Sequence, residues 1–77
     1  ILMVDTVYQP TRQFCDHLLK RLGVETEYYD PLLGADVAKL FRPNTRLVYV
    51  ESPGSQTFEM QDIPAIASVA RERNIWV

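Results

Sequence analysis

Apolar and polar positions along the chain alternate between strand-like and helix-like stretches. Residues 1–5 begin with a continuous apolar run, which is typical of a strand covered on both faces. After Pro10, apolar side chains recur at steps of three and four residues, which predicts a helix that ends at Gly23. The members of this apolar stripe are Phe14, Cys15, Leu18, Leu19 and Leu22.

The middle of the chain repeats this alternation. Residues 24–29 alternate between two faces, one of them more polar, which indicates a strand near a sheet edge. A short helix is expected at about residues 35–42, before a proline-containing break. Residues 47–50 predict a third strand, which runs directly into the loop at residues 51–55.

The last part of the chain predicts one more helix and one more strand. Asp62 suits an N-cap position with Pro64 in the first turn, and Asn74 ends the helix. Ile75 begins a fourth strand, in which we expect Trp76 to fill core. Strands that alternate with helices through short links favour an α/β fold with a mainly parallel sheet and helical crossovers.

The composition narrows the classes of protein to consider. Hydrophobic residues make up 47% of the 77 residues and charged residues 23%, which is ordinary for a soluble globular protein. A net charge of -2 offers no basic surface for nucleic acid or an anionic membrane. No apolar run approaches the about 20 residues that cross a bilayer. The single cysteine, Cys15, excludes an internal disulfide and favours a reducing compartment, by default the cytoplasm.

Both ends of the chain are apolar. Residues 1–4 and 75–77 read as strands without a polar lead-in or tail, whereas natural domains usually end in polar surface segments. We therefore expect residues 1–77 to be a fragment of a single α/β domain. The alternative is a small free-standing domain with exposed apolar ends.

The loops after the first and third strands hold the side chains best suited to binding a ligand. In open α/β sheets, ligands bind outside the carboxyl ends of the strands. The loop at residues 6–9 holds Tyr8, and the loop at residues 51–55 holds Glu51 and Ser55 beside a proline-glycine turn. An aromatic ring and a rigid polar turn on one edge predict a pocket for a flat, polar cofactor. The strand order is open at this point, so the two loops need not be neighbours.

Each candidate residue also has a structural explanation. Taken alone, Tyr8 is better explained as a loop aromatic packed on the sheet edge, and Ser55 and Glu51 fit a structural turn as well as a site. His17 has no second metal ligand nearby and is read as a solvated or structural residue. Cys15 is expected to be a small buried apolar residue.

Four runs of residues, in order, resemble the pyridoxal-phosphate (PLP) dependent transsulfuration enzymes of Cys and Met metabolism, and most of all the cystathionine beta-lyases. The run at residues 5–12 is similar to the segment with the cofactor-stacking tyrosine of that family. The other runs lie at residues 29–36, 51–55 and 58–66. Gamma-lyases and gamma-synthases tend to carry an asparagine at the position of Ser55, so this loop is more similar to the beta-lyase form.

The resemblance implies a fold, an activity and site residues. It implies part of the large cofactor-binding domain of the aspartate-aminotransferase-like PLP fold. The implied parent enzyme is a cytoplasmic homotetramer of methionine biosynthesis that cleaves cystathionine by beta-elimination to homocysteine, pyruvate and ammonia. Tyr8 would stack on the PLP ring and influence proton transfer, with Ser55 and Glu51 also in the cofactor site.

The chemistry of this family also needs groups that the 77 residues do not offer in a matching motif. These are the Schiff-base lysine and the carboxylate that pairs with the pyridinium nitrogen. The lysines present are Lys20 and Lys39, both expected on helix surfaces. The chain alone is therefore expected to be inactive. Another transsulfuration PLP enzyme, or a small non-enzymatic α/β binding module, stays open as an alternative.

Overall fold

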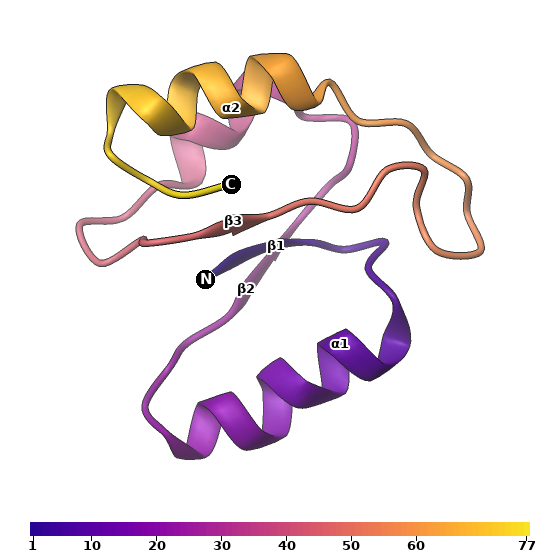
Figure 1. Ribbon diagram of the computed structural model, residues 1–77, viewed down its shortest axis with the longest axis vertical. Coiled ribbons are helices and arrows are strands. Elements are labelled where there is room, and N and C mark those ends of the chain that lie inside the picture. Colours follow the sequence, from indigo (N-terminus) through magenta and orange to yellow (C-terminus); the bar gives the residue numbers. More distant parts are fainter.

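The fold is an α/β arrangement around a parallel sheet, and the computed structural model describes all 77 residues. Strand β1 (Leu2–Val4) lies between β2 (Glu27–Tyr29) and β3 (Val48–Tyr49), and both pairings are parallel (Figure 1). Leu2 pairs with Glu27 on one side and with Val48 on the other. The fold class predicted from the alternating pattern is therefore confirmed.

Helices cover both faces of the sheet. Helix α1 (Gln9–Gln13) continues directly into the π-helical η1 (Phe14–Leu19), and together they lie on one face. The 3-10 helix η2 (Gly34–Leu40) and helix α2 (Ile63–Glu72) pack against each other on the opposite face (Figure 1). None of these helices combines the length and the apolar character needed to cross a membrane.

The core lies around the central strand. All three residues of β1 are buried, as expected for the middle strand of a covered parallel sheet. Val37 of η2 and Ile66 of α2 are 0% exposed, so the face under these two helices is tightly packed. Within α1 and η1 only Cys15 is buried, which confirms its expected place as a small core residue.

The apolar stripe of the first helix is buried only in part. Phe14, Leu18 and Leu22 are 50%, 46% and 71% exposed, so these members of the stripe stay largely at the surface. Cys15 is buried and Leu19 packs against the core in part, so these two members of the stripe face the sheet.

The predicted fourth strand is reduced to an isolated bridge between Leu47 and Trp76. The Val48 N–H donates to the Trp76 carbonyl at 2.8 Å, and the Trp76 N–H donates to the Arg46 carbonyl at 3.1 Å. The indole itself is 79% exposed, so the prediction that Trp76 fills core is wrong. The backbone of Trp76 joins the sheet edge, while no element covers its side chain.

The predicted ends of the helices agree well with the structure. Gly23 has a φ of 82° just after the first helical segment, a conformation that glycine adopts without strain. The Asp62 side chain accepts a hydrogen bond from the Ala65 N–H at 3.1 Å, which confirms it as the N-cap of α2. Asn74 follows α2 with a φ of 56°.

Candidate functional site

The loops after β1 and β3 are neighbours. Because these strands are adjacent and parallel, their carboxyl ends meet at one edge of the sheet. The Ser55 N–H donates to the Thr6 carbonyl at 2.8 Å, and the Tyr8 N–H donates to Glu51 Oε2 at 3.0 Å. We call residues 6–8 and 51–55 the rim. The structure therefore brings together all three residues singled out from the sequence, while their roles stay predictions.

Tyr8 combines a fixed backbone with an open side chain. Its N–H is held by the Glu51 carboxylate, and it directly precedes α1, where Pro10 occupies the first turn. Its side chain is 58% exposed, so the ring does not pack away on the sheet edge as the structural explanation requires. An accessible aromatic face at the carboxyl edge of a parallel sheet is suited to stacking on a flat ligand.

The loop at residues 51–55 approaches the end of β1 very closely. The Gly54 N–H donates to the Glu59 carbonyl at 2.8 Å, and the peptide bond between Ser52 and Pro53 is cis. A Cβ atom on Gly54 would lie 2.5 Å from Thr57 Oγ1 and 2.8 Å from Thr6 Cβ. Only glycine therefore fits between the two loops, and its absent side chain allows the rim to close.

Gln61 is a functional candidate that the sequence did not reveal. It is the buried polar side chain of the fold, at 8% exposure. Its Oε1 accepts a hydrogen bond from the Tyr29 hydroxyl at 2.7 Å, and its Nε2 donates to the Glu51 carbonyl at 2.9 Å. Its N–H donates to Ser52 Oγ at 2.9 Å. A single glutamine carries no periodic signal, so only its three-dimensional partners identify it.

The Tyr29 phenol completes this buried group. Tyr29 ends β2, is 2% exposed and also lies 3.4 Å from the Tyr49 carbonyl through its hydroxyl. Burial raises the pKa of Tyr29 to about 12, since the anion would lose its hydration. The hydroxyl therefore stays a donor to Gln61 at neutral pH.

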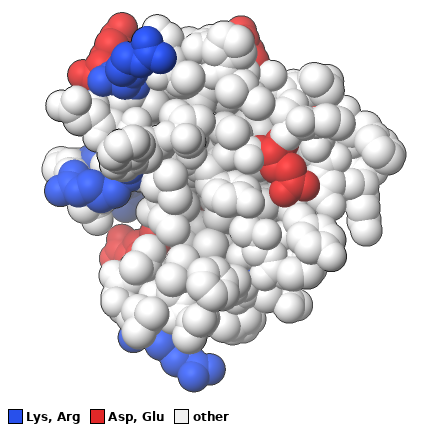
Figure 2. Space-filling view, viewed as in Figure 1, with Lys and Arg blue, Asp and Glu red and all other residues white.

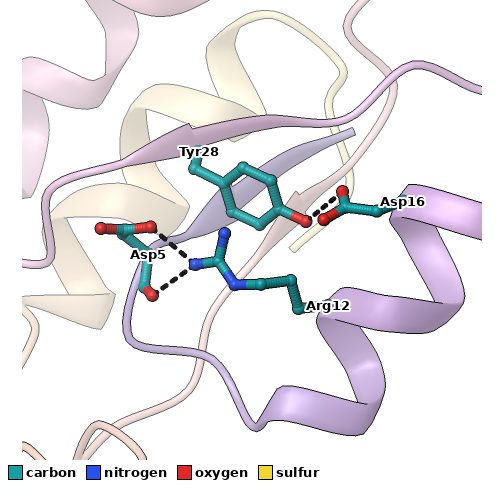
Figure 3. A network of polar contacts seen from close by, with 4 residues as sticks. All are labelled: Asp5, Arg12, Asp16 and Tyr28. Atoms are coloured by element: carbon teal, nitrogen blue, oxygen red, sulfur yellow. Dashed lines mark hydrogen bonds and ion pairs between the residues drawn. The ribbon is translucent and has the colours of Figure 1, made fainter.

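A second polar network connects the first helical segment to the sheet face that this segment covers (Figure 3). Arg12 Nη2 donates to both the carbonyl and Oδ1 of Asp5, each at 2.6 Å, and the guanidinium lies 3.8 Å from the centre of the Tyr28 ring. The Tyr28 hydroxyl donates to Asp16 Oδ1 at 2.6 Å. Burial, together with this hydrogen bond, raises the pKa of Tyr28 to about 12.

A hollow of the surface lies away from the rim. It has a volume of about 750 Å³ and is lined by residues at the amino ends of the strands, among them Ile1, Thr26 and Arg42. Ligands of parallel α/β sheets bind at the carboxyl ends instead, so we place the site at the rim. On the face seen in Figure 2, basic and acidic side chains are interspersed, without a continuous basic patch.

Comparisons with known proteins agree with the resemblance seen in the sequence. The model of the Cys/Met metabolism PLP-dependent enzyme family matches residues 1–77. A Rhizobium johnstonii protein provisionally named cystathionine beta-lyase is 68% identical over 90% of this chain, and the cystathionine beta-lyase MetC of Escherichia coli is 49% identical over 92% of it. A cystathionine gamma-lyase of Bacillus subtilis is 29% identical over 97% of the chain.

The likeness extends to three dimensions. A crystal structure of metB from Corynebacterium glutamicum superposes with a TM-score of 0.89 over 96% of this chain, at 26% identity. The chain spans 17% and 18% of the lengths of the Rhizobium and Escherichia relatives and 19% of that crystal structure's chain. A match over all 77 residues, supported by relatives well above 30% identity, identifies the family. The chain belongs to the Cys/Met metabolism PLP-dependent enzymes.

Proposed function

We propose that this chain is part of the cofactor-binding domain of a PLP-dependent carbon-sulfur lyase that cleaves cystathionine by beta-elimination. The products are homocysteine, pyruvate and ammonia. The observation that carries the proposal is the rim, where neighbouring parallel strands bring the exposed Tyr8 ring beside the Glu51 and Ser55 loop. The higher identity to beta-lyases than to the gamma-lyase favours the beta-elimination.

The residues of the rim fit a flat heteroaromatic cofactor. The Tyr8 ring is 58% exposed while its backbone N–H is held at 3.0 Å by Glu51, so the aromatic face is accessible and the backbone that carries it is fixed. Offset stacking of two rings contributes about 0.5–1.5 kcal/mol beyond the burial of their area. When bound, PLP supplies an electron sink for negative charge at the alpha carbon of an amino-acid substrate.

Each rim residue then has a distinct task. Tyr8 holds the cofactor ring by stacking, and its phenol takes part in proton transfer near the substrate. The Ser55 hydroxyl serves as a polar partner for the cofactor's ring oxygen or for the substrate. Glu51 acts within the protein, because its carboxylate accepts the Tyr8 N–H and thereby orients the loop that carries the ring.

The covalent attachment of the cofactor requires a lysine that this chain does not place at the rim. Lys39 lies in η2 and pairs with Asp36 at 3.4 Å, and Lys20 follows η1 on the helix that covers the other face. We propose that the rest of a full-length enzyme, a cytoplasmic homotetramer, supplies the Schiff-base lysine and the carboxylate for the pyridinium nitrogen. Residues 1–77 alone would then be inactive, as a fragment of one domain.

The identity of the sulfur product tests this proposal. The full-length protein that carries this segment is incubated with PLP and cystathionine, and both halves of the substrate are measured. Cleavage of the beta-carbon–sulfur bond leaves sulfur on the four-carbon half, giving homocysteine and pyruvate. Cysteine and 2-oxobutyrate would instead assign a gamma-lyase, for which the 29% identical Bacillus relative is the precedent. No cleavage and no PLP binding would favour a binding module.

A further inference from the structure

We propose that Gln61 and Tyr29 form a buried positioning pair that sets the place of Tyr8 through Glu51. The inference deepens the proposed function, on which it rests, because it assigns residues that hold the cofactor-facing tyrosine without touching the cofactor. The pair lies behind the rim, at the junction of β2, the loop after β3 and the start of α2.

Gln61 holds two successive residues of the rim. Its Nε2 donates to the Glu51 carbonyl at 2.9 Å and its N–H donates to Ser52 Oγ at 2.9 Å. The Glu51 carboxylate in turn accepts the Tyr8 N–H at 3.0 Å. The chain of contacts therefore runs from Gln61 to the backbone of Glu51, along its side chain, and to the backbone that carries the Tyr8 ring.

Tyr29 holds the second polar atom of the Gln61 amide. The Glu51 carbonyl can only accept, so it takes the NH2 group of the amide, and Oε1 accepts from the Tyr29 hydroxyl at 2.7 Å. Both side chains are buried, at 2% and 8% exposure. Water cannot readily replace a lost partner there, so a buried polar group that loses its partner is destabilised. Removing the phenol hydroxyl therefore loosens the Gln61 amide and the rim that it holds.

The neighbouring residue on β2 provides a matched control. Tyr28 also donates its hydroxyl to a side chain, that of Asp16 at 2.6 Å, but on the face covered by α1 and η1. Tyr28→Phe keeps the ring that lies under Arg12 and removes only the contact to η1. Tyr28→Phe and Tyr29→Phe each delete one hydrogen-bonded hydroxyl from adjacent positions of the same strand.

The experiment compares both variants with wild type in the full-length protein. Hydrogen exchange of residues 6–9 reports on the Tyr8 N–H without cofactor, and PLP titration gives the dissociation constant. We expect Tyr29→Phe to speed exchange of this segment about threefold to tenfold and to weaken PLP binding by a similar factor, since one hydrogen bond contributes about 1 kcal/mol. Tyr28→Phe should leave both within about twofold, although its melting temperature falls comparably.

A second variant tests the pair from its other member. Gln61→Met keeps the volume and the N–H contact to Ser52 Oγ but loses both side-chain hydrogen bonds, so its effects should exceed those of Tyr29→Phe. Equal exchange at residues 6–9 in Tyr29→Phe and Tyr28→Phe would overturn the positioning pair. If exchange is faster in Tyr29→Phe but the wild-type protein binds no PLP, the positioning pair is kept and the proposed function is rejected.

Discussion

Tyr28 and Tyr29 are adjacent on β2, but they belong to two different regions of the molecule. Tyr28 faces α1 and η1, where Arg12 stacks on its ring and Asp16 accepts its hydroxyl (Figure 3). Tyr29 points to the opposite face and binds Gln61 behind the rim. Consecutive strand residues alternate between faces. One side chain of β2 therefore contacts the helix on one face, and the next contacts the residues behind the candidate site.

The two faces are stabilised by different means. Under η2 and α2, fully buried apolar side chains such as Val37 and Ile66 form the core. On the α1 face, only Cys15 of the helix is buried, and a polar network connects helix and strand while much of the apolar stripe stays exposed. The comparison indicates that the α2 face determines stability of the chain, and that the α1 face adds less.

Truncating one apolar residue on each face should give the largest difference. Ile66→Ala removes a side chain at 0% exposure and should lower the free energy of unfolding by about 2–5 kcal/mol. Leu18→Ala acts at 46% exposure and should change it by less than about 0.5 kcal/mol. Urea denaturation of the 77-residue chain measures both. Equal losses would show that both faces stabilise the chain to the same extent and would contradict this account. A larger effect of Leu18→Ala in the full-length protein would show that another part of that protein covers the stripe.

A methyl group at the rim should have the next largest effect. Gly54→Ala places a Cβ within 2.8 Å of Thr6 and should cost about 1–3 kcal/mol of stability, with faster hydrogen exchange at residues 6–9. Gly23→Ala is the control, because no atom lies within 4 Å and only its φ of 82° opposes the change. It should destabilise without altering exchange at the rim. A Gly54→Ala protein with wild-type exchange would contradict the close approach.

Alkaline pH should have the smallest effect on the free energy of unfolding, and it acts through both tyrosines. The pKa of each is raised to about 12 in the folded chain from 10.0, so the unfolded phenols ionise first. Their contribution to stability is complete below about pH 10 and is lost as the pH rises from about 10 to about 12. Tyr28→Phe and Tyr29→Phe should each flatten this decline in unfolding experiments. A decline as steep as wild type in both variants would refute the raised pKa values.

Local signals in the sequence predicted much of the fold. The alternation of strand and helix patterns gave the parallel α/β sheet, and Asp62 before a proline gave the N-cap of α2, because such features depend on near neighbours. The neighbouring rim loops followed once β1 and β3 were adjacent. The strand order itself was not encoded locally, and it alone decided whether Tyr8 and Ser55 share an edge.

What the sequence did not reveal depends on distant partners. Gln61 lies 32 positions from Tyr29, and no residue next to it in the chain predicts its burial or its contacts. The apolar residues at the end of the chain indicated that Trp76 is buried, but such a pattern does not specify how much surface the rest of the chain provides to cover the indole. Side-chain networks and coverage are properties of the assembled fold.

Retention of PLP by Tyr8 variants tests the central proposal most directly. The full-length protein is loaded with PLP in its wild-type, Tyr8→Phe and Tyr8→Ala forms, and the dissociation constant is measured after removal of free cofactor. Because a stacked ring contributes through its face, Tyr8→Phe should stay within about threefold of wild type, whereas Tyr8→Ala should lose about tenfold or more. Equal PLP affinity in all three forms would contradict a cofactor-stacking role for the exposed ring at the rim.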